Sequence, residues 1–234
     1  MTSSVTARIY LVRHGATVLS AEDAFAGETD VALSEDGREQ VRRLAARLAG
    51  EPIAAFYSSP MSRTMETARI LAEPHHLHVL PRDGLREISH GHWEGRKRAE
   101  VERLFPEEYA RWEADPFSTA SEGGESGLAV TARALPELLR IVEAHEGRHV
   151  LLVSHKATIR LLVSALLGLD PRAYRDRLDQ SPACLNILDF KDSTHTRLSL
   201  FNDTSHCAPG ASATPEMPHE RLSKWWDRGP DPKK

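Results

Sequence analysis

The sequence predicts an α/β fold, a three-layer α/β/α sandwich whose central sheet is largely parallel and ends in a C-terminal hairpin. Short apolar runs rich in β-branched residues alternate along the chain with longer segments whose apolar residues recur at helical spacing. This order is typical of strands joined by crossover helices. Near the end, residues 184–190 and 196–201 alternate apolar and polar side chains around a short polar segment, which predicts the hairpin.

Capping residues limit the predicted elements in the first half of the chain. Ser34 is a suitable N-cap for a helix with Glu35 and Asp36 in its first turn, because a serine hydroxyl accepts hydrogen bonds from the free N–H groups there. Gly50 and Pro52 end that helix. The expected elements are strands at residues 8–12, 53–57 and 77–80, and helices at residues 34–50, 61–71 and 96–104, the last stopped near Pro106.

The second half begins with a predicted surface loop at residues 115–127, which is rich in Ser, Gly and Glu and carries Pro116. From Ser126, apolar residues run at helical spacing to Val142. Pro136 interrupts this pattern, so the helix is either kinked there or begins just before it. The remaining elements are a strand at residues 149–153 and a helix with a buried stripe over residues 159–166, closed by Gly168 and Pro171.

The composition excludes several classes of protein. A chain of 234 residues buries roughly 70–75% of its unfolded surface, so it needs no metal or disulfide in order to fold. The two cysteines, Cys184 and Cys207, fit a reducing and therefore cytoplasmic compartment. A net charge of −4 gives no support to nucleic-acid binding, which favours a basic face.

The sequence predicts neither a secretory signal nor a membrane span. The N-terminus lacks a positively charged region, and the apolar run that follows it is too short for a signal sequence. The most apolar later stretch, residues 150–169, is interrupted by His155, Lys156 and Arg160.

We predict a catalytic domain over residues 1–202 and a Pro-rich tail over residues 203–234. The last 26 residues hold five prolines and few apolar side chains apart from Leu222, Trp225 and Trp226. Whether the two tryptophans fold back over the domain, support a homodimer or have no role stays open at this point.

Basic side chains follow three of the predicted strands directly. Arg13 and His14 follow the first strand, Arg63 closes the polar segment after the second, and His155 follows the strand at residues 149–153. In open α/β sheets, ligands bind outside the carboxyl ends of the strands, so these side chains are expected at one edge. A guanidinium group binds two phosphate oxygens at once through two N–H groups. An imidazole can donate a hydrogen bond to a phosphate oxygen or attack the phosphorus atom. The sequence therefore predicts a site for a dianion.

A series of motifs in fixed order covers about residues 8–170. They are Leu-Val-Arg-His-Gly at residues 11–15, Phe-Ala-Gly-Glu-Thr-Asp at 25–30, Ser-Ser-Pro-Met-Ser-Arg-Thr at 58–64, Leu-Arg-Glu-Ile at 85–88 with Trp-Glu-Gly at 93–95, and Val-Ser-His at 153–155. This series resembles the histidine phosphatase superfamily of phosphoglycerate mutase-like proteins. The Arg-His-Gly triplet alone is a weak signal, whereas the ordered set is specific.

The resemblance implies a role for each basic residue. His14 would be the nucleophile, with its second ring nitrogen fixed as a donor to a backbone carbonyl. Arg13, Arg63 and a protonated His155 would hold the phosphoryl oxygens. Glu87 would protonate the leaving alkoxide and then activate water, for which its pKa should rise toward neutrality.

Three positions depart from the family pattern. Ala16 replaces the common Glu after the Arg-His-Gly triplet, and Ser20 replaces the common phosphate-binding Asn. The phosphate site would then be weaker, or completed by Thr29 or a backbone amide. Lys156 stands where Gly is common after the final His; it would either select an anionic substrate or point to solvent.

The spacing after the Trp-Glu-Gly motif favours the phosphatase branch with a short lid. Only about thirty residues separate Gly95 from the turn at residues 123–126, whereas the mutases carry a long insertion there. An open site lets water reach the phosphohistidine. We predict a phosphomonoester phosphatase that acts on small phosphorylated metabolites. A phosphoglycerate mutase-type transferase and a non-catalytic phosphoanion-binding protein are the alternatives.

The alcohol part of the substrate is not identified by the sequence. The lid, residues 96–125, would contact it, and Arg96 and His92 are candidate substrate-binding residues, while Glu94 is the rival to Glu87 as the acid. The histidine-dense segments 75–78 and 90–92 lack the paired spacing of a closed zinc site. We therefore expect no metal and no cofactor, and a small phosphorylated substrate as the partner, with a homodimer left open.

Overall fold

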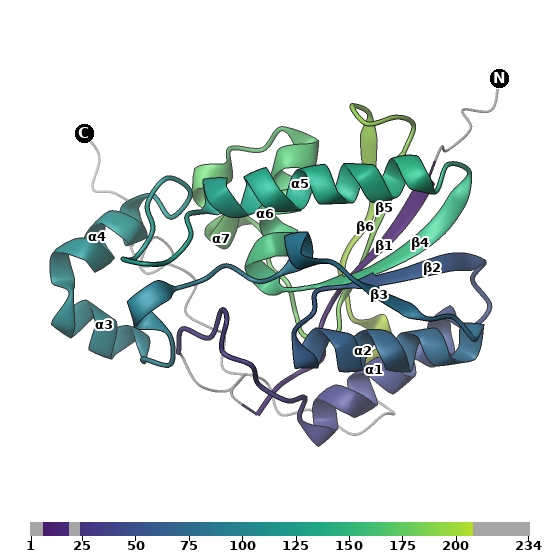
Figure 1. Cartoon of the computed structure of the whole chain (residues 1–234), viewed down its shortest axis with the longest axis horizontal. Helices are drawn as coiled ribbons and strands as arrows, with labels where there is room; N and C mark the ends of the chain where they lie inside the picture. The colour runs from purple at the N-terminus through teal and green to yellow at the C-terminus, as the bar shows by residue number, and fades with distance from the viewer. Residues whose placement is uncertain (1–6, 19–23, 208–234) are drawn as a thin grey trace.

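A six-stranded sheet forms the core of the computed structural model, which describes residues 7–18 and 24–207 (Figure 1). The strand order is β3-β2-β4-β1-β5-β6. In this order, β3, β2, β4 and β1 pair in parallel, whereas β5 pairs antiparallel with both β1 and β6. This confirms the largely parallel sheet with a C-terminal hairpin. The strands are β1 (Ala7–Arg13), β2 (Ile53–Ser58), β3 (Val79–Pro81), β4 (Arg148–Ser154), β5 (Leu185–Phe190) and β6 (Thr196–Asp203).

Helices cover both faces of the sheet, because the strands send successive side chains to opposite sides. Ile9 and Leu11 of β1 share an apolar cluster with α5 and α6, whereas Tyr10 and Val12 share a second cluster with α1 and α2. The predicted three-layer sandwich is confirmed. The helices are α1 (Glu35–Leu48), α2 (Ser62–Ala72), α3 (Arg98–Leu104), α4 (Pro106–Ala114), α5 (Gly127–Ala144), α6 (Lys156–Leu167) and α7 (Tyr174–Arg177).

Serine side chains cap the starts of two helices, and the cap at Ser34 was predicted. The Ser34 hydroxyl accepts a hydrogen bond from the Gly37 N–H at 3.0 Å, and the Ser126 hydroxyl accepts one from the Ala129 N–H at 3.2 Å. Pro136 lies inside α5, which begins at Gly127, so the alternative start just before Pro136 is wrong. The cap at Ser126 supplies the first-turn partner that sets this start.

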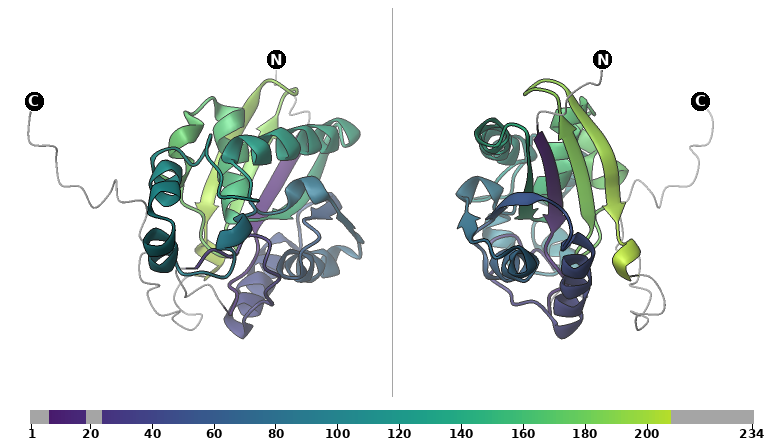
Figure 2. Two further views of the ribbon diagram at one scale, coloured as in Figure 1. Left: turned by 60° about the vertical axis from the view of Figure 1, so that its left-hand side comes forward. Right: turned by 90° about the vertical axis from the view of Figure 1, so that its right-hand side faces the viewer.

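The lid contains two helices where the sequence predicts one. The predicted helix at residues 96–104 is present as α3, which ends before Pro106. Pro106 is also the first residue of a second helix, α4. Proline is favourable at that position because its missing N–H would have no helical partner there. Figures 1 and 2 show α3 and α4 at one end of the molecule, apart from the helices that cover the sheet.

The described chain continues a few residues past the predicted domain boundary at 202. β6 ends at Asp203, whose carboxylate pairs with Arg47 of α1 at 2.5 Å, and a short 3₁₀ turn follows at Ser205–Cys207. The rest of the predicted tail, with Trp225 and Trp226, lies outside the described residues. Within the described part of the chain, none of the helices has the length and apolar character needed to cross a membrane.

Candidate active site

The candidate active site lies at the carboxyl ends of β1, β2 and β4. Arg13 is the last residue of β1 and His14 follows it, Arg63 is the second residue of α2, and His155 is the N-cap of α6 directly after β4. All four side chains are buried, and the ring centroids of His14 and His155 lie 5.3 Å apart. The structure therefore brings together the four basic residues that the sequence places at strand ends.

The His14 ring is oriented by its own backbone neighbour. Nδ1 lies 2.8 Å from the Gly15 carbonyl oxygen, and because a carbonyl can only accept, Nδ1 carries the hydrogen and Nε2 keeps its lone pair. Burial, with the charges of Arg13 and Arg63, holds the pKa of His14 well below its ordinary value. A neutral imidazole with a free Nε2 is the form that attacks phosphorus.

Gly15 lets the loop after His14 pack closely against α1. A Cβ at this position would meet the Gly37 carbonyl oxygen at 2.6 Å, inside the closest approach that side chains tolerate. Gly37 lies in the first turn of α1, so the start of that helix supports the backbone that carries the nucleophile.

Arg63 links the second histidine to the loop after β1. Its Nη1 and Nη2 donate to the carbonyl oxygens of Thr29 and Gly27, each at 2.8 Å, and its Nε donates to Nδ1 of His155 at 3.3 Å. His155 Nδ1 is then an acceptor, which leaves Nε2 as the donor to the Ser59 hydroxyl at 2.8 Å.

The predicted protonation of His155 does not match its surroundings within the protein. Burial and the charge of Arg63 hold the pKa of His155 well below its ordinary value, so the neutral form is favoured. Protonation therefore requires the charge of a bound dianion beside the ring.

One hydrogen bond holds the guanidinium group of Arg13. Nη1 donates to the Gln180 carbonyl oxygen at 2.6 Å, while the buried Nε has no hydrogen-bond partner among the described residues. Burial lowers the pKa of Arg13, although the group stays a cation because its ordinary pKa is so high. A desolvated guanidinium with unused N–H groups interacts strongly with an anion.

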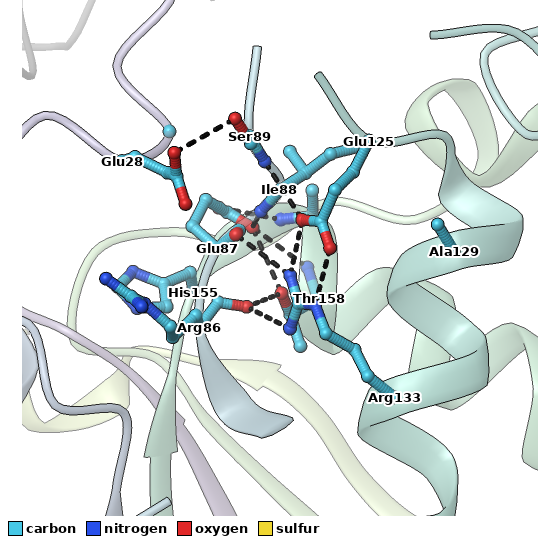
Figure 3. A network of polar contacts seen from close by, with 12 residues as sticks. Glu28, Arg86, Glu87, Ile88, Ser89, Glu125, Ala129, Arg133, His155 and Thr158 are labelled. Atoms are coloured by element: carbon cyan, nitrogen blue, oxygen red, sulfur yellow. Dashed lines mark hydrogen bonds and ion pairs between the residues drawn. The ribbon is translucent and has the colours of Figure 1, made fainter. Parts of the chain in front are cut away.

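Glu87 lies against the first turn of α6, where Figure 3 shows it near Thr158. Its two carboxylate oxygens accept hydrogen bonds from the Ala157 N–H at 3.1 Å, the Thr158 N–H at 3.2 Å and the Thr158 hydroxyl at 3.2 Å. A helix N-terminus favours negative charge. The structure thus places a carboxylate at the start of the helix that His155 caps, and the acid–base role of Glu87 stays a prediction.

A partly buried ion pair holds the segment that carries Glu87. Arg133 of α5 pairs through Nε and Nη2 with both oxygens of Glu125, at 2.8 and 2.7 Å. The same guanidinium donates to the carbonyl oxygens of Gly84, Arg86 and Glu87, at distances from 2.9 to 3.0 Å (Figure 3). Arg133 therefore fixes the backbone on which the acid stands.

Glu94, the predicted rival to Glu87, holds two loops together. Its carboxylate accepts hydrogen bonds from the N–H groups of Gly27, Glu28, Thr29 and His90 at distances from 2.9 to 3.3 Å, and from the Thr29 hydroxyl at 2.9 Å. Two carboxylate oxygens offer about four acceptor positions. The donors from these loops fill them, so Glu94 connects the two loops, and the choice of Glu87 as the acid stays a prediction.

Two predicted phosphate contacts, Thr29 and Ser20, have different outcomes. Thr29 donates its hydroxyl hydrogen to Glu94 and gives its carbonyl oxygen to Arg63, so its contacts orient Arg63. Ser20 lies outside the described residues, and its substrate-binding role stays a prediction.

His92 and Arg96 make their contacts with the lid. His92 Nε2 lies 3.1 Å from a carboxylate oxygen of Glu108 in α4, and its ring lies 4.5 Å from that of Phe105. Arg96 pairs with Glu100 of α3 at 2.7 Å. Both residues help to fold the lid, and their predicted role in substrate binding stays a prediction.

Lys156 is the first residue of α6 and is half-buried. Burial, with the charges of Arg13 and Arg160, lowers the pKa of Lys156 to about 6. Because Lys156 is half-buried, neither predicted alternative, contact with an anionic substrate or exposure to solvent, is decided.

Several contributors were not found by sequence reasoning. Thr158 lies three residues after His155 and could have been found from helical spacing, whereas Ser59 had the local signal of the Ser-Ser-Pro motif. Arg133 and Gln180 gave no local signal, because their contacts are with residues far away in the sequence.

The histidine-dense segments do not form a metal site among the residues that are described. His90 packs its ring 4.8 Å from Phe25, next to Trp112, and burial lowers its pKa to about 4. Across residues 7–18 and 24–207, no group of three or more His, Cys, Asp or Glu side chains is arranged to hold a metal ion.

The fold and these side chains together define a class of protein. A neutral histidine after β1, two buried arginines, a second histidine after β4 and a carboxylate at the start of α6 are the groups that phosphoryl transfer through histidine requires. The model of the histidine phosphatase superfamily (branch 1) matches residues 9–204. The chain belongs to this superfamily, which confirms the resemblance found in its motifs.

Individual relatives support the same assignment. The chain is similar to Phosphoserine phosphatase 1 of Hydrogenobacter thermophilus, at 36% identity over 70% of this chain and 77% of that protein. It is also similar to the probable phosphoglycerate mutase GpmB of Yersinia enterocolitica, at 34% identity over 80% and 86%. The solved structure of Bacillus stearothermophilus YhfR matches with a TM-score of 0.81 at 30% identity, over 86% of this chain and 100% of that one. Family and relatives assign the chain to the phosphatases, which hydrolyse phosphomonoesters.

Proposed function

We propose that this protein hydrolyses small phosphorylated metabolites through a phosphohistidine intermediate at His14. The observation that carries the proposal is the hydrogen bond from His14 Nδ1 to the Gly15 carbonyl oxygen, which leaves Nε2 as the nucleophile. His155 lies beside this ring, and the charges of Arg13 and Arg63 act on it, so the two arginines are the proposed donors for the phosphoryl oxygens.

In the first half-reaction, Nε2 of His14 attacks phosphorus and the bond from phosphorus to the ester oxygen breaks. The two arginines offset the charge on the phosphoryl oxygens, and His155 donates to one of them once the dianion has raised its proton affinity. Glu87, protonated in the substrate complex, gives its proton to the leaving alkoxide. The alcohol departs, and phosphohistidine and ionised Glu87 remain.

In the second half-reaction, Glu87 removes a proton from a water molecule that attacks the phosphohistidine. The bond from phosphorus to Nε2 breaks, inorganic phosphate is released, and His14 is again neutral. The N–H donors at the start of α6 stabilise the ionised carboxylate between the two steps.

Phosphoglycerate mutase activity is the second candidate, because a probable mutase is among the relatives. The first half-reaction would be the same, and the phosphoryl group would pass to an alcohol instead of water. The short lid supports hydrolysis, since a mutase must exclude water from the phosphohistidine. Supplied with 3-phosphoglycerate, the protein should release inorganic phosphate faster than it forms 2-phosphoglycerate; the reverse order of rates would establish the mutase.

Trapping the phosphoenzyme tests the proposal directly. We expect rapid alkaline quenching with a ³²P-labelled phosphomonoester to leave label on the wild-type protein that survives base and is lost in acid. His14→Ala should carry no label, whereas His195→Ala, a change in the exposed turn between β5 and β6, should label like the wild type. A wild-type protein that binds phosphate but neither labels nor releases phosphate would be the non-catalytic phosphoanion-binding protein.

Two further expectations belong with this proposal. We propose a cytoplasmic location on the basis of cysteine usage, and both Cys184 and Cys207 are free thiols. The small phosphorylated substrate is the proposed partner, and the homodimer stays a prediction.

A further inference from the structure

The loop after β1 carries an acidic side chain, Glu28, that the steps above do not use. The carbonyl oxygens of its two neighbours, Gly27 and Thr29, accept hydrogen bonds from the Arg63 guanidinium, each at 2.8 Å. The Glu28 N–H donates to the Glu94 carboxylate at 3.0 Å. The backbone of Glu28 is therefore held beside an arginine that is proposed to bind the phosphoryl group.

The side chain of Glu28 reaches the segment that carries Glu87. The Ser89 hydroxyl donates to Oε2 of Glu28 at 3.1 Å, and Ser89 lies two residues after Glu87. The same hydroxyl oxygen accepts from the Gly91 N–H at 3.3 Å, which leaves its hydrogen for Glu28. Figure 3 shows the Glu28 carboxylate next to Ser89, above Glu87 and His155. Ser89 is buried and Glu28 is exposed, so the carboxylate is oriented by the protein and accessible to a ligand.

Glu28 differs in its partners from the other acidic residues near it. Glu125 pairs with Arg133, Glu94 binds the N–H groups of two loops, and Glu87 binds the N–H groups at the start of α6. Among the residues that the structure describes, the Glu28 side chain accepts from one neutral hydroxyl and pairs with no Lys or Arg. A carboxylate offers about four acceptor positions, so most of those of Glu28 remain for a ligand.

We propose that Glu28 selects the alcohol part of the substrate and favours an alcohol that carries an ammonium group. The inference rests on the proposed function and narrows it to phosphomonoesters of amino alcohols. Arg63 binds the carbonyl groups on both sides of Glu28, so one small molecule can place its phosphate at Arg63 and its ammonium at Glu28. An ammonium suits this position because a carboxylate binds a charged donor more strongly than a neutral hydroxyl, whereas it repels an anionic group.

A matched pair of esters tests the selection by Glu28. Phosphoethanolamine and propyl phosphate have chains of the same length and differ in an ammonium against a methyl group. Because their alcohols differ in acidity, the ratio of the two kcat/KM values is compared between protein variants. We expect Glu28→Gln to lower the ratio in favour of phosphoethanolamine by roughly 5- to 10-fold, between the range of an exposed ion pair and that of a charged hydrogen bond. The amide keeps an acceptor for the Ser89 hydroxyl, so propyl phosphate should be hydrolysed nearly as before.

Two controls separate a local charge effect from other causes. Glu143→Gln removes the same charge from an exposed position on α5 and should keep the wild-type ratio. Ethylene glycol monophosphate carries a neutral hydroxyl where phosphoethanolamine carries the ammonium, and Glu28→Gln should change its kcat/KM much less. An equal loss on these two esters would mean that Glu28 selects hydroxyl groups, and the assignment to amino alcohols would be wrong.

The outcomes separate this inference from the proposed function. An unchanged ratio in Glu28→Gln, or an equal change in Glu143→Gln, would overturn the role of Glu28 while leaving the phosphatase intact. If none of the esters were hydrolysed, the proposed function would fail. Calorimetric affinities of the wild type and Glu28→Gln for phosphoethanolamine and propyl phosphate would then still decide the selection, because only the ammonium ester should lose affinity in Glu28→Gln.

Discussion

The active site has two regions that are held in place by different means. The floor, formed by Arg13, His14, Arg63 and His155, stands at strand ends, where the His14 N–H donates to the Ser154 carbonyl oxygen and its own carbonyl accepts from Ala183. The rim, residues 84–94, has no strand. It is held by side chains, chiefly Arg133, Glu125 and Glu94 (Figure 3). Backbone pairing therefore fixes the nucleophile, while ion pairs fix the acid.

The largest expected effect is a loss of kcat, and it should distinguish Glu87 from Glu94, the two carboxylates of the rim. Glu87→Gln removes the proton donor, so kcat for an alkyl phosphate should fall by roughly 10²- to 10⁴-fold. The fall should be much smaller with p-nitrophenyl phosphate, because p-nitrophenolate leaves without a proton. Steady-state kinetics with both substrates measures the difference, and Glu143→Gln, an exposed change on α5, serves as the control.

Glu94→Gln should behave differently, because its carboxylate only positions loops. An amide places N–H groups where five donors converge, so the free energy of unfolding should fall by about 1–3 kcal/mol. Any loss of kcat should be the same for both leaving groups. If the loss of kcat depended more strongly on the leaving group in Glu94→Gln than in Glu87→Gln, Glu94 would be the acid and Glu87 the positioning residue.

A smaller effect is expected when the support of the rim is weakened. Arg133→Lys keeps the charge but cannot reach Glu125 and the three carbonyl oxygens together, so Glu87 should lose its position. We expect kcat to fall by about tenfold with KM nearly unchanged, since misplacement affects the reacting geometry more than binding.

The leaving-group test shows whether Arg133 acts through Glu87. The loss in Arg133→Lys should be larger for alkyl phosphates than for p-nitrophenyl phosphate, as in Glu87→Gln. Arg140→Lys is the matched control, because Arg140 lies on the same helix and is 70% exposed. Equal losses for both leaving groups would mean that Arg133 supports only the fold.

The floor could be predicted from the sequence, and the support of the rim could not. A residue that directly follows a buried strand must lie at the sheet edge, so strand periodicity alone places Arg13, His14 and His155. Arg133 reaches Glu87 across 46 residues of sequence, and no local pattern announces such a contact. The same limit applies to Glu94, which resembles an isolated loop charge until its donors are seen.

The missed helix α4 has a similar physical origin. Pro106 was interpreted as the end of a helix, because proline cannot continue one. The same residue can begin the next helix, and here Tyr109 and Trp112 of α4 pack with Trp93 and Phe25 in the lid. Proline at residue 106 is compatible with the end of one helix and with the start of the next, and the aromatic packing of the lid favours the second helix.

The floor should also make stability depend on pH. The folded protein holds His14 and His155 neutral well below pH 6.5, whereas the unfolded chain takes up protons there. The unfolded state then binds more protons, so the free energy of unfolding falls as pH drops below about 6.5. Each group contributes at most about 1.4 kcal/mol per pH unit.

Urea unfolding in phosphate-free buffer at several pH values between 7 and 5 measures this slope. His14→Gln should flatten it, because one titrating group is removed from the floor, and His195→Gln, an exposed change, should not. An unchanged slope in His14→Gln would show that the low pKa of His14 is not linked to folding.

The smallest expected effect tests whether the floor is held by the sheet alone. Ser34→Ala removes the N-cap of α1 and should lower the free energy of unfolding by about 1 kcal/mol. Because Gly37, in the first turn of α1, packs against Gly15, a displaced helix start could also move His14. If strand pairing fixes the nucleophile, kcat/KM should stay within about twofold of the wild type and Ser34→Thr should restore stability. A larger loss of kcat/KM in Ser34→Ala that is absent in Ser34→Thr would show that the α1 cap also positions His14. The floor would then depend on a side-chain contact, as the rim does.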